Sequence, residues 1–406
     1  MIDAQYWLDA PDTRPEIFLN TLSTLNTVLA DWRQQWPDCG ILALLPEARQ
    51  ALLAPLQQAC RQQAMPLLGA CFPHLVTSAG FSDQGIWLLR FNTMPAHALV
   101  PALPADSVQA ATQLVAALPA LSALPDAGSD GENACPTLFL LFDGMLPHIG
   151  SILNQLYFRF RRQLHFSGVN AGSERFQPMP CLFDGEHLYG DGVMALLLPA
   201  GIQTLVEHGF PVSRALMQAT STEGNRIDHI NGKPSFSVYQ EIMWSEYGVQ
   251  LTHENFYDYA VHFPFGVVTM LDVLVRIPVG FNEDGSLFCV GEVPPNAMLR
   301  LLRAPALEDS QCVNRIVRRL QGSHPPARSP LFLTFYCAGR RMHFGTEASR
   351  ELSALQHASG STELAGALSL GEIDTLPGLD VPRFHNACIV CIGQAQAQIT
   401  APDTDI

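Results

Sequence analysis

The sequence contains little that would carry the chain into or across a membrane. No uninterrupted apolar run reaches the roughly 20 residues that a membrane-spanning helix needs, because proline, glycine or a charged residue interrupts each run. The opening segment, MIDAQYWLDAPDTRPE, has no basic stretch followed by an apolar one, as a secretory signal would. We therefore expect a soluble, cytoplasmic protein with no membrane among its partners.

Basic residues are scarce as well. Lysine and arginine together number 23, against 38 aspartates and glutamates, and the formal net charge is −15. A chain with such an excess of negative charge is repelled by the phosphate backbone of DNA and RNA. Nucleic acid is therefore not expected as a partner.

The ten cysteines lack the paired spacing of a disulfide framework. They lie within apolar segments, which is typical of reduced, buried thiols in a cytosolic protein. Cys388 and Cys391 form a CxxC pair, but residues three apart on a strand point to opposite faces of the sheet. Neither a disulfide nor a shared metal ion is expected there.

Familiar catalytic motifs are missing too. The sequence has no GxSxG elbow, no phosphate-binding loop, no GxGxxG after a strand and no HExxH. A hydrolase would have to use Cys337 or Cys71 as its nucleophile, with a histidine in hydrogen-bond reach and a lowered thiol pKa. We expect a non-catalytic protein and keep the cysteine-dependent hydrolase as an alternative.

What is present indicates a folded α/β protein. Apolar residues make up 48% of the 406 residues and charged residues 15%, enough for about two domains of roughly 100 to 200 residues. Short apolar runs, such as 39–45 and 137–144, alternate with amphipathic stretches, such as 46–63. This alternation predicts an α/β or α+β fold: two related mixed-sheet domains, divided near Gly224, with helices packed on the sheets and a ligand cleft at the strand ends.

Glycines and polar side chains gather where several predicted strands end. Glycines at such positions either let the backbone approach a ligand or simply form tight turns, and ligands of open α/β sheets bind at the carboxyl ends of strands. An arginine, a glutamate and an asparagine at neighbouring strand ends would suit a zwitterion such as an amino acid. The candidate ligand-binding residues are Asn170, Gly172, Cys337, Gly339, Arg340, Gly371, Glu372, His385 and Asn386.

One histidine stands out by its neighbours. His262 lies in AVHFPFGV, among the aromatic and aliphatic side chains that typically surround an axial ligand of haem iron. A single histidine in an apolar segment is more often a structural residue. His262 is therefore a metal ligand only if haem is bound.

The order of several short segments resembles the FIST family. These segments are TLFLLFDG, FSGVNAGSERF, LFDGEHLYGDGVMALLL, NRIDHINGKPSFSVYQE, LFLTFYCAGRRMHFG, SLGEI and FHNACIVCIG. The resemblance implies an N-terminal FIST domain over 20–218 and a C-terminal FIST domain over 222–393. Two segments differ from the usual pattern, GVNAGSE and GACFPH, which leaves the identity of a ligand open.

The resemblance implies a sensory function without catalysis. FIST domains are described as bacterial intracellular input domains that bind small ligands such as amino acids. Some members bind haem and report nitric oxide to histidine kinases or cyclic-di-GMP enzymes. We therefore expect a small-molecule ligand, amino-acid-like or haem with nitric oxide, and a separate signalling protein as the partner. A purely structural interaction protein is a weaker alternative.

Overall fold

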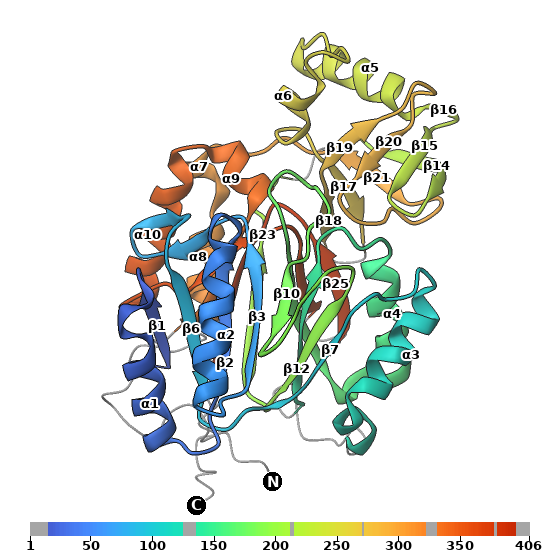
Figure 1. The fold of residues 1–406 in the computed structure, drawn as a ribbon. Helices are drawn as coiled ribbons and strands as arrows, with labels where there is room; N and C mark the ends of the chain where they lie inside the picture. The colour runs from blue at the N-terminus through green and yellow to red at the C-terminus, as the bar shows by residue number, and fades with distance from the viewer. Residues whose placement is uncertain are drawn as a thin grey trace, which may run out of the picture.

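The computed structural model describes residues 15–124, 135–211, 215–269, 272–321, 331–376 and 380–394. They form a large body and a smaller lobe above it (Figure 1), and the mixture of helices and mixed sheets confirms the predicted α/β class. The lobe comprises residues 217–269 and 272–301, and the other described residues form the body. No helix in these ranges is both long and apolar enough to cross a membrane.

Three copies of one unit make up the body. Each copy begins with an edge strand and a helix, continues with two parallel strands joined by further helix, and ends with a β-hairpin and an antiparallel strand. The paired parallel strands are apolar along their length because both faces of their sheets are covered. The sequence periodicity alone indicated only a series of strands and helices, since the repeated units share topology and not residues.

The first two units follow each other directly along the chain. Unit 1 contains β1 (Glu16–Leu19), α1 (Leu25–Gln35), β2 (Gly40–Pro46), α2 (Leu53–Gln62), β3 (Leu67–Phe72), the hairpin β4 (Leu75–Thr77) and β5 (Gly80–Ser82), and β6 (Ile86–Phe91). Unit 2 contains β7 (Ala96–Val100), α3 (Ser107–Ala117), β8 (Thr137–Asp143), α4 (Ile149–Phe160), β9 (His165–Ala171), the hairpin β10 (Leu182–Asp184) and β11 (Leu188–Tyr189), and β12 (Val193–Leu198).

The third unit is interrupted by the lobe. Unit 3 contains β13 (Ile202–Glu207), α7 (Leu307–Ser310), α8 (Cys312–Gln321), β22 (Leu331–Cys337), α9 (Ala338–Phe344), α10 (Glu347–Ser359), β23 (Gly366–Ser369), the hairpin β24 (Glu372–Leu376) and β25 (Val381–His385), and β26 (Ile389–Gln394). The lobe, inserted after β13, contains β14 (Met217–Glu223), β15 (Arg226–Ile230), β16 (Lys233–Pro234), α5 (Ser235–Tyr247), α6 (Phe256–Ala260), β17 (Phe265–Val268), β18 (Val273–Arg276), β19 (Pro278–Phe281), β20 (Leu287–Cys289) and β21 (Met298–Leu301).

Hairpin exchange ties the three units together. The hairpin of unit 1 pairs with β23 of unit 3, the hairpin of unit 2 pairs with β3 of unit 1, and the hairpin of unit 3 pairs with β9 of unit 2. The resulting sheet orders are β1-β6-β2-β3-β10-β11, β25-β24-β9-β8-β12-β7 and β13-β26-β22-β23-β4-β5. The predicted segments 20–218 and 222–393 therefore share two of these three sheets.

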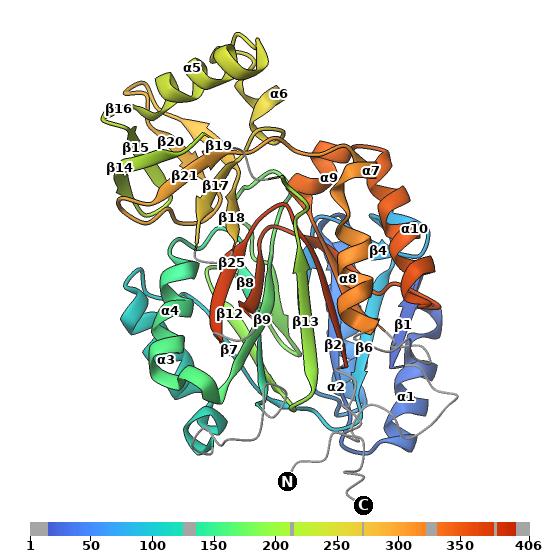
Figure 2. The same cartoon turned by 180° about the vertical axis from the view of Figure 1, so that it is seen from behind.

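The three sheets meet in a common core, and helices cover their outer faces. Leu44 of β2, Phe139 of β8 and Phe335 of β22 belong to the same buried cluster, and the rings of Phe139 and Phe335 stack at 6.4 Å. Figure 2 shows α3 and α4 beside one sheet and α8 and α10 beside another. The lobe has a separate core, formed by residues such as Tyr239 and Phe265.

Several local predictions agree with the structure. The run at 39–45 becomes β2, and the stretch at 46–63 becomes a short 3-10 helix, η3 (Glu47–Leu52), followed by α2. The dipeptide Asn231–Gly232 predicts a hairpin turn, and it forms the two-residue turn between β15 and β16. The φ values of 51° and 76° there require residues that tolerate the left-handed region. Residues 125–134, whose acidic and glycine-rich sequence predicts a loop, lie outside the described residues.

One predicted loop is a strand in the structure. The glycines and small polar residues of SGVNAGSERF predict a loop, but SGVNA completes β9, which pairs with β8 on one side and β24 on the other. The hairpin strand β24 comes from unit 3, about 200 residues further along the chain, so local sequence gave no sign of this pairing.

Candidate functional site

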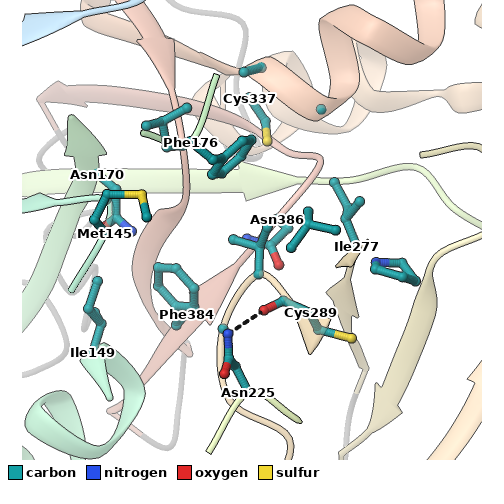
Figure 3. Close-up of a pocket in the computed structure, with 18 of the residues that line it drawn as sticks. Met145, Ile149, Asn170, Phe176, Asn225, Ile277, Cys289, Cys337, Phe384 and Asn386 are labelled. Atoms are coloured by element: carbon teal, nitrogen blue, oxygen red, sulfur yellow. Dashed lines mark hydrogen bonds between the residues drawn. The ribbon is translucent and has the colours of Figure 1, made fainter. Parts of the chain in front are cut away.

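A cavity of about 610 Å³ lies between the lobe and the ends of the body strands. Its lining residues come from five body segments and from the lobe (Figure 3). The body contributes 144–149 after β8, 170 and 174–176 around the end of β9, 337–339 and 342 at α9, 370 between β23 and β24, and 384 and 386 at the end of β25. The lobe contributes 225, 257, 260–261, 277–279 and 289–292. A ligand in this space would therefore contact both parts of the molecule.

Most of the cavity wall is apolar. Met145, Ile149, Ile277 and Phe384 present aliphatic or aromatic surface to it (Figure 3). Phe176 joins them from the loop after β9, where its φ of 51° places a non-glycine residue in the left-handed region. Such backbone strain persists where the surrounding structure holds it, and it gathers at functional sites. The wall suits a ligand with a hydrophobic body.

Two buried asparagines interrupt this apolar wall. Asn170 and Asn386 are each 1% exposed and line the cavity, and within the described part of the chain the Oδ1 atom of each has no hydrogen-bond partner. The Nδ2 group of Asn386 donates to the carbonyl of His385 at 2.8 Å, which fixes its amide orientation. A buried acceptor without a partner costs about 1–3 kcal/mol, so each oxygen would gain from a donor that a ligand brings within hydrogen-bond reach.

Cys337 lies in the wall, but it acts as a capping group. Its sulfur accepts a hydrogen bond from the backbone N–H of Ala387 at 3.1 Å and also contacts the backbone N–H groups of Gly339 and Arg340 at the start of α9. Burial raises the pKa of the Cys337 thiol far above its ordinary value. Burial likewise raises the pKa of Cys71 to about 12. Neither thiol has the lowered pKa that the hydrolase alternative needs.

Gly339 and Gly371 are required by close packing and not by turn geometry. A Cβ atom on Gly339 would lie 2.4 Å from Cδ1 of Ile277, and one on Gly371 would lie 2.4 Å from the ring of Phe384. Gly172 has a φ of 128° and donates its N–H to the carbonyl of Cys71, so it forms a tight turn beside the cavity. Of the three, Gly339 lines the cavity.

Glu372 lies beneath the cavity wall and is fully buried. It accepts a hydrogen bond from Oγ of Ser369 at 2.6 Å, whereas its Oε2 has no partner among the described residues. Burial raises the pKa of Glu372 to about 8, so the carboxyl is largely protonated at neutral pH. A neutral carboxyl at this depth adds no negative charge to the site.

His385 belongs to a buried ionic cluster behind the sheet. Its Nε2 contacts Asp374 at 2.8 Å, and Asp374 also receives two hydrogen bonds from Arg383. Burial raises the pKa of Asp374, but the interactions with His385 and Arg383 outweigh it and lower the pKa to about 2. Burial lowers the pKa of His385. His385 therefore supports β24 and β25 from within and does not line the cavity.

Arg340 does not reach the cavity either. All five of its N–H groups bond to protein atoms: two to the carboxylate of Glu351 at 2.7 and 2.9 Å, two to the carbonyls of His208 and Ala387, and one to the sulfur of Cys312. The side chain is only 1% exposed. We expected a ligand to provide a carboxylate that accepts two hydrogen bonds from Arg340. Glu351 of the protein provides that carboxylate instead.

His262 lies in the lobe, away from the cavity lining. Its Nδ1 faces Nδ1 of His343 on α9 at 2.5 Å, and Nε2 of His343 contacts the carbonyl of Pro305 at 3.0 Å. Burial lowers the pKa of both histidines. His262 is therefore placed as a contact between lobe and body, and it is not among the lining residues of the cavity, whereas its neighbours Ala260 and Val261 are.

Of the nine ligand-binding candidates, the structure brings Asn170, Cys337, Gly339 and Asn386 into the cavity wall. Gly371, Glu372 and His385 lie beneath it, and Gly172 and Arg340 lie beside it. The sequence reading missed the lobe residues, among them Asn225 and Glu292. Nothing in the local sequence marks them, because a folded lobe is needed to bring them over the strand ends.

Two family models match the chain. The FIST N domain model matches residues 40–233, and the FIST C domain model matches residues 235–374. The junction between the two matches lies in β16 of the lobe. No curated protein sequence matches the chain. FIST domains are associated with sensory signal transduction, and this chain belongs to the FIST family.

Proposed function

We propose that the protein is a non-catalytic sensor that binds a small molecule in the cavity between lobe and body and signals to a separate protein. The observation that carries this proposal is the shared cavity wall, in which two buried asparagines have unpaired oxygens. A wall with unpaired polar atoms among apolar side chains is typical of a binding site for a small organic ligand.

Lobe and body touch at several points around the cavity. Glu292 of the lobe accepts hydrogen bonds from the backbone N–H and the Oγ of Ser151, at the start of α4. Arg276 donates to the carbonyl of Phe384 at 3.0 Å and to that of Glu292 at 2.8 Å. A ligand that contacts both parts stabilises those positions of the lobe, relative to the body, that fit it best. Ligand binding therefore increases the population of these positions, and this increase is the signal that the partner detects.

The partner in this proposal is a signalling protein such as a histidine kinase or a cyclic-di-GMP enzyme. An exposed aromatic side chain on the lobe supports a protein contact there: Trp244 on α5 is 64% exposed. Tyr257 on α6 is 61% exposed and also lines the cavity. Since the lobe also contributes to the cavity wall, a partner bound to it would respond to ligand binding.

The experiment is a thermal-shift screen of the full chain against amino acids, amines and carboxylic acids. A ligand that binds the native state raises the melting temperature, and the increase grows with the logarithm of its concentration relative to its Kd. A hit should lose its effect when Ile277→Trp fills the cavity, whereas Val108→Ala, at an exposed position of α3 outside the cavity lining, should preserve it. If hits shift the filled variant as much as the parent protein, the ligand binds elsewhere and the cavity is not the sensory site.

A haem-binding nitric oxide sensor is the second candidate, and one observation favours it. His148 lines the cavity, and its Nδ1 contacts Oε1 of Glu292 at 3.3 Å. Histidines that ligate metals usually bind a carboxylate through their other nitrogen in this way. Protein purified from haem-supplemented cells should then show a Soret band that shifts with nitric oxide and that His148→Ala abolishes, with His262→Ala as the control. A colourless protein would reject this version.

A further inference from the structure

The cavity offers hydrogen-bond acceptors to a ligand. Oδ1 of Asn170 and Oδ1 of Asn386 are deeply buried and unpaired within the described residues, as set out above. Both side chains are drawn in the cavity wall in Figure 3. An acceptor is satisfied only by an N–H or O–H group, so the complementary ligand must carry donors at this place.

Several donors that border the cavity already have partners within the chain. The backbone N–H of Gly144 donates to Ala171, and that of Met145 donates to Asp143. Asn225 donates its Nδ2 to the carbonyl of Cys289 at 3.0 Å, the one hydrogen bond drawn in Figure 3. A ligand carboxylate would have to compete with these existing bonds.

The two helices that begin at the cavity are capped as well. The first turn of α4 donates to the carboxylate of Glu292, through the N–H and Oγ of Ser151. The first turn of α9 is capped by the sulfur of Cys337. Helix starts of this kind attract anions when they are open, but here groups of the chain itself occupy them.

The charged lining residues also disfavour an anion. Glu174 and Glu292 line the cavity together with a single arginine, Arg175, which is exposed on the loop after β9. The buried guanidinium of Arg276 donates from Nε and Nη1 to main-chain carbonyls. A carboxylate buried in this wall would have to compete with these carbonyls for the guanidinium of Arg276.

We propose that the ligand is an apolar molecule that carries an ammonium or other N–H donor group and no carboxylate. Its donors bond to Oδ1 of Asn170 and Asn386, and its hydrophobic body packs against Met145, Ile277 and Phe384. The assignment rests on the proposed function and narrows it. This ligand differs from the zwitterion that the sequence predicts. A zwitterion was expected because Arg340 would bind its carboxylate, but Arg340 donates to the carboxylate of Glu351 instead.

The test uses three compounds that share one aromatic body. 2-Phenylethylamine has the amine alone, phenylalanine has the amine and a carboxylate, and 3-phenylpropanoate has the carboxylate alone. Isothermal titration of the full chain should show the amine binding at least about tenfold more tightly than phenylalanine, because an unpaired buried carboxylate is costly. The carboxylate alone should bind most weakly.

Variants then locate the donor contact. Asn170→Leu and Asn386→Leu should each weaken binding of the amine about tenfold, since each removes one acceptor. Asn170→Asp should strengthen binding of the amine and weaken binding of 3-phenylpropanoate. The same change in the exposed Asn314 of α8, Asn314→Asp, adds an equal charge far from the wall and should alter neither affinity. Melting curves of each variant verify folding, and Asn170→Asp remains informative if a leucine variant fails to fold.

The outcomes separate this inference from the proposed function. If 3-phenylpropanoate binds as tightly as 2-phenylethylamine, with the same loss in the cavity-filled Ile277→Trp variant, the site binds ligands but the donor assignment is overturned. Equal binding of all three compounds also overturns it. If none of the three binds and the wider screen finds no ligand that Ile277→Trp excludes, both the inference and the proposed function fail.

Discussion

Two buried polar regions lie side by side at the end of unit 3 and differ in how fully their hydrogen bonds are formed. Arg340 bonds through all five donors, and one of them reaches the carbonyl of Ala387. The neighbouring Asn386 leaves its Oδ1 unpaired and faces the cavity. Buried polar groups that find every partner within the chain maintain the fold, whereas those left without a partner mark a place for a ligand.

The largest expected loss of stability comes from removing Arg340, whose hydrogen bonds are all formed within the chain. Arg340→Met leaves the carboxylate of Glu351 buried without its cation, and removal of one member of a buried ion pair costs ~3–5 kcal/mol. Chemical denaturation measures the loss. The adjacent Arg341, whose side chain is 28% exposed, is the control: Arg341→Met should cost no more than ~1 kcal/mol. Equal losses for the two variants would contradict the structural role of Arg340.

The next effect is a pH dependence that comes from Glu372. Its folded pKa of about 8 lies above the value of about 4.3 in an unfolded chain, so the unfolded state releases the proton first as pH rises. Stability therefore falls between about pH 4.3 and pH 8, by at most ~1.4 kcal/mol per pH unit, and Glu372 has no further effect above its folded pKa.

Urea denaturation of the parent protein and of Glu372→Gln across that pH range isolates this contribution. The difference in unfolding free energy between the two proteins should shift in favour of the glutamine variant as pH rises. A difference that stays constant across the range would show that the carboxyl is ionised in the folded protein.

A smaller effect is expected where lobe and body meet. Glu292→Ala removes the carboxylate that caps α4, and the loss of a capping interaction costs ~1 kcal/mol. Hydrogen exchange should become faster at the start of α4 and in the facing lobe segment. Glu283, exposed on the lobe, provides the matched control, because Glu283→Ala should leave exchange at α4 unchanged. Unchanged exchange in both variants would remove Glu292 from the lobe contact.

The smallest effect on stability is expected at Asn170 in the cavity wall. Asn170→Leu deletes an acceptor that has no partner in the described structure, so no hydrogen bond to Oδ1 is lost and a buried polar atom is removed. The unfolding free energy should change by less than ~1 kcal/mol, in contrast to Arg340→Met. A loss as large as that of Arg340→Met would mean that Asn170 has a structural role.

Local sequence predicted elements better than it predicted the site. The strands at β2 and β8 and the Asn231–Gly232 turn follow from apolar runs and turn chemistry, which act over a few residues. Asn170 and Asn386, predicted as ligand-binding residues, both line the cavity because both stand at strand ends. Arg340 was placed in the cavity because a strand-end arginine looks the same in sequence whether its carboxylate partner is a ligand or, as here, Glu351 of α10.

The sequence by itself determined the α/β class, the family and the scarcity of basic residues, since these depend on composition and on short patterns in fixed order. Only the tertiary structure decided the exchange of hairpins among the three units and the insertion of the lobe over the strand ends. Pairing between β9 and β24 joins segments about 200 residues apart, and such pairing depends on three-dimensional packing. The same packing decided which buried polar groups found partners and which face the cavity.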